Sequence, residues 1–141
     1  MLKTNLFVAA PDFPRDEHML LAGGEYEESV ALAHQLGYDG IELVAGDPDD
    51  VNADALESAL RGQSMSIAAI NSGGLNYVLN VSLVNADAAK ERLAFRKLEA
   101  LIRLAARFRC LLQIGGARRG ARRPAHVGIP RPAGGCHPAS L

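Results

Sequence analysis

Four short apolar runs divide the chain, and segments with helical spacing lie between them. The runs are Leu6–Ala10, Gly40–Val44, Met65–Ile70 and Leu111–Ile114, and Pro, Gly or polar residues bound them. Continuous apolar runs of this length are typical of buried strands. Between the runs, apolar residues recur three or four positions apart, which predicts helices from Glu25 to Leu36, around Leu56 and Leu60, and from Ala86 to Phe108.

Local signals support the buried face or the ends of each predicted helix. One face of the first helix carries Tyr26, Val30, Ala33 and Leu36, and Gly37 follows as a helix-ending residue. Asp54 and Glu57 have the spacing of a capping box for the second helix. The longest apolar stripe lies on the third helix and consists of Leu93, Leu98, Leu101, Ile102, Ala105 and Phe108.

The order strand, helix, strand, helix, strand, helix, strand predicts an α/β fold with four parallel strands and three crossover helices. Residues 11–24 and 75–85 are expected to be loops, and residues 47–50 a turn. The periodicity ends after Gly116, and 18 of the last 25 residues are Ala, Arg, Gly or Pro. We therefore expect residues 117–141 to be a disordered or frameshifted tail, because GC-rich codons in a shifted frame encode these residues.

Charge separates the same two parts of the chain. The whole chain carries −1, but residues 1–116 carry −6 and residues 117–141 carry +5. The two cysteines, Cys110 and Cys136, form neither a disulfide framework nor a CxxC zinc pair, which indicates reduced thiols. No apolar run approaches the ~20 residues of a membrane helix, and the first residues lack a convincing signal-peptide pattern. A cytoplasmic location is expected.

Three stretches, Leu36–Leu43, Ile67–Gly73 and Ala86–Gly116, together resemble the sugar phosphate isomerase/epimerase family of xylose-isomerase-like TIM barrels. The resemblance covers about residues 4–116 and rests on the order and spacing of the three stretches. One departure is Phe108-Arg109-Cys110, which stands where the family usually has Gly at the end of its third helix. Because a complete (β/α)8 barrel takes about 250 residues, the resemblance implies a partial TIM barrel, the N-terminal half only.

This resemblance implies carbohydrate metabolism, with a divalent metal assisting the isomerisation or epimerisation of a small sugar, sugar phosphate or hydroxy-keto acid. Family members hold the metal with Glu, Asp, His and Glu from the second half of the barrel. This chain has no acidic residue beyond Glu99, and His126 and His137 stand without carboxylate neighbours. We therefore expect a truncated, inactive chain that binds no metal itself. A restored full-length gene, read past the stop codon, would test the enzyme and frameshift hypotheses.

Four residues near the ends of predicted strands are candidates for substrate binding, since such residues face the active site of a barrel. Glu42 either lines the substrate cavity, as the resemblance implies, or ties adjacent strands together. Asn71 and Ser72 either bind substrate hydroxyls or form a turn. Gln113 is the fourth candidate, although a hydrogen-bonded core amide is the simpler interpretation.

Two other functions remain open. An open half-barrel would act as a binding or assembly fragment, and metal-dependent endonucleases share the same barrel. The exposed strand edges and inner face of half a barrel predict self-association. The Arg-rich tail lacks the interleaved aromatic residues of nucleic-acid-binding segments, so nucleic acid is not the expected partner. Gly73-Gly74 alone is a weak phosphate signal, and His18 and His34 are expected to be solvated.

Overall fold

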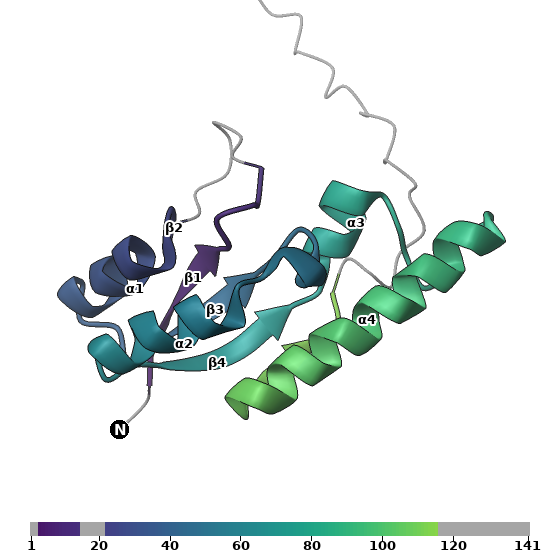
Figure 1. The fold of residues 1–141 in the computed structure, drawn as a ribbon. Helices are drawn as coiled ribbons and strands as arrows, with labels where there is room; N and C mark the ends of the chain where they lie inside the picture. Colours follow the sequence, from purple (N-terminus) through teal and green to yellow (C-terminus); the bar gives the residue numbers. More distant parts are fainter. Residues whose placement is uncertain (1–2, 15–21, 116–141) are drawn as a thin grey trace, which may run out of the picture.

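The computed structural model describes residues 3–14 and 22–115, which form an α/β fold around a parallel sheet (Figure 1). The strand order is β2-β1-β3-β4-β5, and every pair is parallel. The strands are β1 (Asn5–Ala9), β2 (Ala22–Gly23), β3 (Gly40–Val44), β4 (Ser66–Asn71) and β5 (Leu111–Gln113). The four predicted strands are confirmed within one or two residues. The two-residue β2 was not predicted, because it lies in the polar segment that was expected to be a loop.

The three predicted helices are confirmed as α1 (Tyr26–Gln35), α2 (Ala53–Gly62) and α4 (Ala88–Phe108). The 3-10 helix η1 (Pro48–Asp50) forms the predicted turn. A further helix, α3 (Gly73–Leu79), occupies residues expected to be a turn and a loop. Two glycines reduce the helix propensity of this short segment. Gly74 is needed for close packing against the end of β3, since a Cβ there would overlap the Ala45 carbonyl oxygen.

The main core lies between the sheet and helices α1, α2 and α4. Ile41 and Leu43 of β3, Leu56 of α2 and Leu101 of α4 are at most 1% exposed within it. The predicted helix faces are confirmed except at their margins. Leu36 is 61% exposed and Ile102 is 51% exposed, so the buried faces are narrower than predicted.

A second, smaller cluster lies on the opposite face of the sheet, near the ends of the first strands. It consists of Ala9, Phe13 and Val44, with Phe7 and Val78 packed against them. The Phe13 and Tyr77 rings stack beside it with centroids 5.6 Å apart. Helix α3 lies at the end toward which the strand arrows point (Figure 1), so this end of the sheet is partly covered.

A β-bulge interrupts the pairing of β3 with β4. Ile41 pairs with Ile67, but the next residue, Glu42, pairs with Ala69 rather than with Ala68. Because side chains alternate between the two faces of a strand, the extra residue changes which β4 residues face the helices. Ile67 and Ile70 both lie in the helix-covered core as a result.

Three helices end with the same pair of backbone hydrogen bonds. At α1 the left-handed residue is Gly37, with φ of 80°, as predicted. The equivalent residues are Ser64 after α2, with φ of 54°, and Arg109 after α4, with φ of 52°. At Arg109, the Cys110 N–H donates to the Ala105 carbonyl and the Arg109 N–H donates to the Ala106 carbonyl. The helix-ending motif thus forms at Phe108-Arg109-Cys110 without a glycine.

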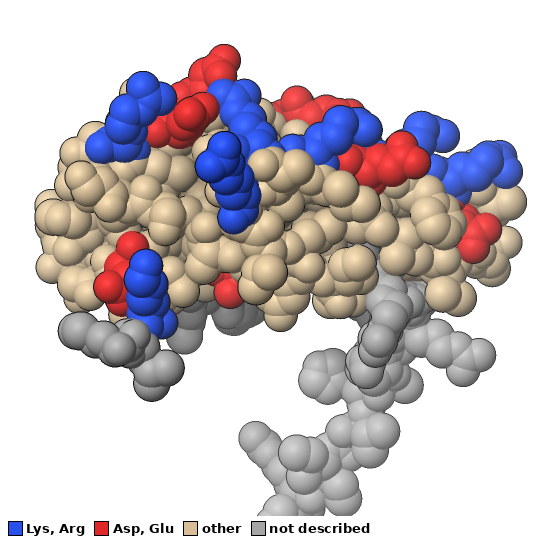
Figure 2. All heavy atoms as spheres, turned by 90° about the horizontal axis from the view of Figure 1, so that it is seen from below, with Lys and Arg blue, Asp and Glu red and all other residues tan. Residues whose placement is uncertain are grey.

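The first residues of α2 use a different cap from the one predicted. The Asn52 side chain accepts a hydrogen bond from the Ala55 N–H at 3.1 Å, so Asn52 is the N-cap. Asp54 and Glu57 instead bind Arg107 of α4, and these hydrogen bonds raise the pKa of the guanidinium. In the view from below, Figure 2 shows charges of both signs gathered along one border of an otherwise largely uncharged face.

Several sequence predictions lie outside the described residues. These are the tail from Gly116 onward with Cys136, His126 and His137, and the part of the first loop that contains His18.

His34 is exposed in the last turn of α1, as predicted. Cys110 is a free thiol whose pKa is raised by burial. Within residues 3–14 and 22–115, no helix combines the length and apolar character needed to cross a membrane.

Candidate functional site

Three of the predicted site residues form a polar row on the face of the sheet opposite the main core. Glu42 lies on β3, Asn71 ends β4 and Gln113 ends β5. The Asn71 side-chain nitrogen, Nδ2, donates to Oε1 of Gln113 at 3.1 Å and to Oε1 of Glu42 at 3.4 Å. Asn71 therefore connects side chains from three adjacent strands, and we call Glu42, Asn71 and Gln113 the polar row.

The backbone after β4 determines which way the Asn71 amide points. Oδ1 of Asn71 accepts the Gly73 N–H at 2.7 Å, so the amide nitrogen must face the row. Only glycine fits at position 73 in this geometry, because a Cβ there would lie 2.8 Å from Oδ1. With Asn71 fixed, one carboxylate oxygen of Glu42 and the amide N–H groups of Gln113 form no hydrogen bond to another described residue and can bind an external partner.

Ser72 stabilises the backbone beside the polar row and is not exposed on the surface of the site. Its side chain is fully buried. Its N–H donates to the Gln113 carbonyl at 3.0 Å, and its Oγ accepts the Gly115 N–H at 3.2 Å. Ser72 thus joins the ends of β4 and β5, which favours the turn alternative over hydroxyl binding at this position.

The contacts and exposure of Glu42 and Gln113 decide between the alternative interpretations of these two candidates. Glu42 is half-buried and contacts Asn71 on the neighbouring strand, as the strand-tying alternative predicts. Gln113 is exposed, so its interpretation as a core amide is wrong. A role in substrate binding remains a prediction for each of these residues.

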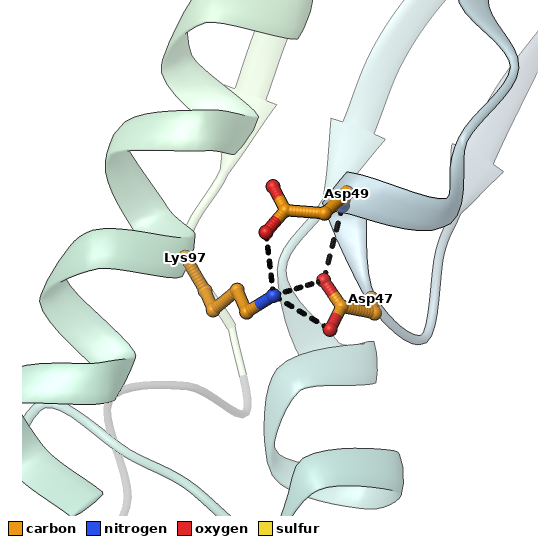
Figure 3. Close-up of polar contacts among 3 residues, drawn as sticks. All are labelled: Asp47, Asp49 and Lys97. Atoms are coloured by element: carbon orange, nitrogen blue, oxygen red, sulfur yellow. Dashed lines mark hydrogen bonds and ion pairs between the residues drawn. The ribbon is translucent and has the colours of Figure 1, made fainter.

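An ion-pair cluster that was not predicted joins α4 to the loop after β3 (Figure 3). The Lys97 ammonium lies 2.6 Å from both carboxylate oxygens of Asp47 and 2.7 Å from Oδ2 of Asp49. The Lys97 side chain is only 14% exposed. Burial lowers the pKa of Lys97, but the hydrogen bonds and charges of Asp47 and Asp49 outweigh it, so the pKa is raised overall.

A sequence signal for this cluster did exist. Lys97 lies between Ala94 and Leu101, at helical spacing on the buried face of α4. A lysine in such a position requires a carboxylate partner. The acidic turn at Asp47-Pro48-Asp49-Asp50 supplies two carboxylates, but nothing in the spacing indicates that α4 crosses this turn.

A divalent metal does not fit the described residues. In the part of the chain that the structure describes, no three His, Cys, Asp or Glu side chains come close enough together to hold a metal ion. The polar row contributes a single carboxylate and two amides. Its chemistry is that of a hydrogen-bonding surface with one negative charge.

Comparison with known proteins finds similarity only among solved structures. No protein-family model matches the sequence, and no curated protein matches it significantly. An AP endonuclease of family 2 from Brucella melitensis is similar over 76% of this chain and 39% of its own length, with 18% identity and a TM-score of 0.47. A D-allulose 3-epimerase from Methylomonas sp., solved with D-allulose, is similar over 80% of this chain and 51% of its own, with 13% identity and a TM-score of 0.37.

The described sheet and helices have the α/β class expected from the sequence. The chain spans about two fifths to one half of the lengths of these two structures.

Proposed function

We propose that residues 1–116 are the N-terminal half of a xylose-isomerase-like barrel and bind a small sugar or hydroxy-keto acid at the polar row. The supporting observation is the convergence of Glu42, Asn71 and Gln113, which come from three strands and meet through one amide. A sugar hydroxyl can donate to the free oxygen of Glu42. A neighbouring carbonyl or hydroxyl oxygen can accept from the Gln113 amide.

This proposal concerns recognition, and no catalytic step is assigned to the chain. The family reaction uses a metal, whereas the described residues lack a suitable ligand set. We propose that the intact enzyme, with the second half of its barrel, is the isomerase or epimerase. Metal-dependent isomerisation by the purified 141-residue chain would refute this assignment.

Ligand titration by NMR tests the recognition proposal. D-allulose and a panel of other ketoses and hydroxy-keto acids are added, and the side-chain amide signals of Asn71 and Gln113 are followed. We expect saturable shifts at both amides. Gln113→Leu should weaken binding about tenfold, as expected for the loss of one or two hydrogen bonds. Gln35→Leu, at an exposed amide on α1, is the matched control and should bind normally.

Two outcomes would contradict sugar recognition. One is the absence of saturable shifts at the row with every member of the panel. The other is a duplex oligonucleotide that shifts the same amides more strongly than any sugar, which would favour the endonuclease alternative. Asn71→Asp provides a further check, because it places a second carboxylate beside Glu42 and should weaken sugar binding without changing the size of the side chain.

The exposed edge of β5 favours a second candidate function, assembly with another copy of the chain. Leu111 on this edge strand is 74% exposed, and Ile114 just beyond it is 49% exposed. A strand edge presents alternating N–H and C=O groups, so two identical edges can pair with each other. The opposite edge, β2, has only two residues, which leaves β5 as the more suitable edge.

Light scattering at micromolar concentration tests this assembly. We expect a dimer or larger species for the full chain, and Leu111→Lys should shift the population toward monomer because a charged edge resists pairing. Leu36→Lys is the matched control, since Leu36 is 61% exposed after α1. A monodisperse 15.0 kDa monomer of the unmodified chain would refute the assembly proposal.

A further inference from the structure

A groove of about 320 Å³ lies at the end of the sheet opposite the polar row, where β4 begins. The last turns of α2 and α4 border it on either side of Ser66, the first residue of β4. Its volume lies at the lower end of the range for small-molecule sites. The groove shares no residue with the polar row, so it is a separate surface of the molecule.

One part of the groove lining is apolar. Leu60 of α2 and Ile67 of β4 are each 5% exposed and form its floor. The partly buried side chains of Met65 and Phe108 extend this apolar surface toward the solvent. A ligand with an apolar body is therefore favoured, because its contact with these side chains removes apolar surface from water.

The charged part of the lining leaves one cation without a partner. Arg107 binds Asp54 and lies 2.8 Å from Oε2 of Glu57. Arg61 lies 3.6 Å from Oε1 of the same Glu57. The Arg109 guanidinium forms no ion pair or hydrogen bond with another described residue. Three guanidinium groups and two carboxylates thus leave one net positive charge, which is available to an anion.

The backbone of Arg109 supplies an independent sign that this side chain has a use. Arg109 ends α4 in the left-handed conformation, with φ of 52°. A non-glycine residue in this conformation costs free energy that glycine avoids, and such strain is concentrated at binding and active sites. Gly37 forms the same kind of helix end after α1, so the end of α4 does not require an arginine side chain.

The two helix ends indicate which kind of anion fits the groove. The carboxyl end of a helix carries about half a negative charge, and both α2 and α4 end beside the groove. This partial charge opposes a dianion such as hydrogen phosphate. A single carboxylate instead matches the one unpaired guanidinium, with which it can form two parallel hydrogen bonds.

We propose that this groove binds a small monocarboxylate with an apolar body, such as an arylalkanoate. The carboxylate pairs with Arg109, and the apolar body lies over the apolar part of the lining. The exposed Ser66 hydroxyl can donate a further hydrogen bond to the carboxylate. This site goes beyond the proposed sugar recognition and does not depend on it.

NMR titrations of the full chain with phenylpropionate, acetate and phenylpropanol test the proposal at constant ionic strength. Acetate lacks the apolar body, and phenylpropanol lacks the charge. We expect saturable shifts of the Ser66 and Arg109 backbone amides with phenylpropionate. It should bind about tenfold tighter than either of the other probes, because one loses apolar contact and the other loses charge-assisted hydrogen bonds.

Two glycine variants separate binding from folding. Arg109→Gly removes the guanidinium and relieves the strain, so it should weaken phenylpropionate binding about tenfold while raising the urea midpoint. Ser64→Gly is the matched control, because it relieves the same strain after α2 without changing the groove lining. It should raise the midpoint and bind normally. Arg103→Gln is the charge control, since Arg103 is exposed on α4 outside the groove.

Three results would overturn the proposal. The first is the absence of saturable shifts with phenylpropionate. The second is equal weakening of its binding by Arg103→Gln and by Arg109→Gly, which would indicate general attraction to a basic surface. The third is tighter binding of inorganic phosphate than of phenylpropionate at the same amides, because the apolar part of the lining would then have no role.

Discussion

Replacement of Lys97 by methionine tests how firmly α4 is held to the sheet. Methionine keeps the unbranched side chain and removes the charge. The change would leave Asp47, whose side chain is 19% exposed, without its cation and beside a second carboxylate on Asp49. The immediate consequence is an uncompensated, partly buried negative charge.

The expected magnitude follows from the exposure of the three groups. Removing one partner of a fully buried ion pair costs about 3–5 kcal/mol, whereas surface pairs contribute about 0–1 kcal/mol. Lys97 and Asp47 are mostly buried, but Asp49 is 65% exposed. We therefore expect Lys97→Met to lower the free energy of unfolding by about 2–3 kcal/mol, between these limits.

Urea unfolding followed by circular dichroism measures this difference, and its pH dependence identifies the cause. Because the folded-state pKa of Lys97 is raised above 10.5, its contribution is fully present below pH 10.5. The contribution is lost as the pH rises through the folded-state pKa. The difference between the unmodified chain and the variant should therefore be constant near neutral pH and shrink above pH 10.5.

Two comparisons make this prediction refutable. Lys90→Met removes a lysine from the first turns of the same helix and should change stability by less than about 0.5 kcal/mol, as surface substitutions usually do. Asp47→Asn combined with Lys97→Met should recover part of the loss, because it removes the uncompensated charge. The reasoning fails if Lys97→Met alters stability no more than Lys90→Met, or if its effect persists unchanged well above pH 10.5.

Further substitutions test the helix ends and the packing of α3, each by urea unfolding. Ser64→Gly and Arg109→Gly should each stabilise the chain by about 1 kcal/mol, because glycine adopts positive φ without strain; unchanged midpoints would contradict this. Asp87→Ala should destabilise it by about 1 kcal/mol through loss of the α4 N-cap, whereas Asp87→Asn should be nearly neutral. Gly74→Ala should cost more than about 2 kcal/mol, because its Cβ would overlap the Ala45 carbonyl; a tolerated alanine would show that α3 can move away.

The sequence predicted the sheet and the long helices because each repeats a simple period over enough residues. It did not predict α3, whose packing against Ala45 depends on a contact with a distant strand end. The capping box at Asp54 and Glu57 had the right spacing, but Arg107, 53 and 50 residues later, binds both carboxylates. Local patterns cannot show such competition between a cap and a distant cation.

The candidate site was accessible from the sequence because parallel strands bring their carboxyl ends to the same edge of a sheet. Glu42, Asn71 and Gln113 could therefore be selected without knowing their contacts. The roles within the set could not be predicted, because they depend on which way each side chain points.

The bulge opposite Ile41 accommodates one extra residue in β4 without moving the polar row. Deleting Ala68 would restore regular pairing, and Ala69, Ile70 and Asn71 would remain opposite Glu42, Leu43 and Val44. Asn71 would therefore stay on the open face beside Glu42, and Ile70 would stay toward the helices. Deleting both Ala68 and Ala69 would instead place Ile70 opposite Glu42 and Asn71 opposite Leu43. The apolar side chain would then face the open side and the amide would be buried under the helices, so β4 should tolerate the loss of one residue at the bulge but not of two.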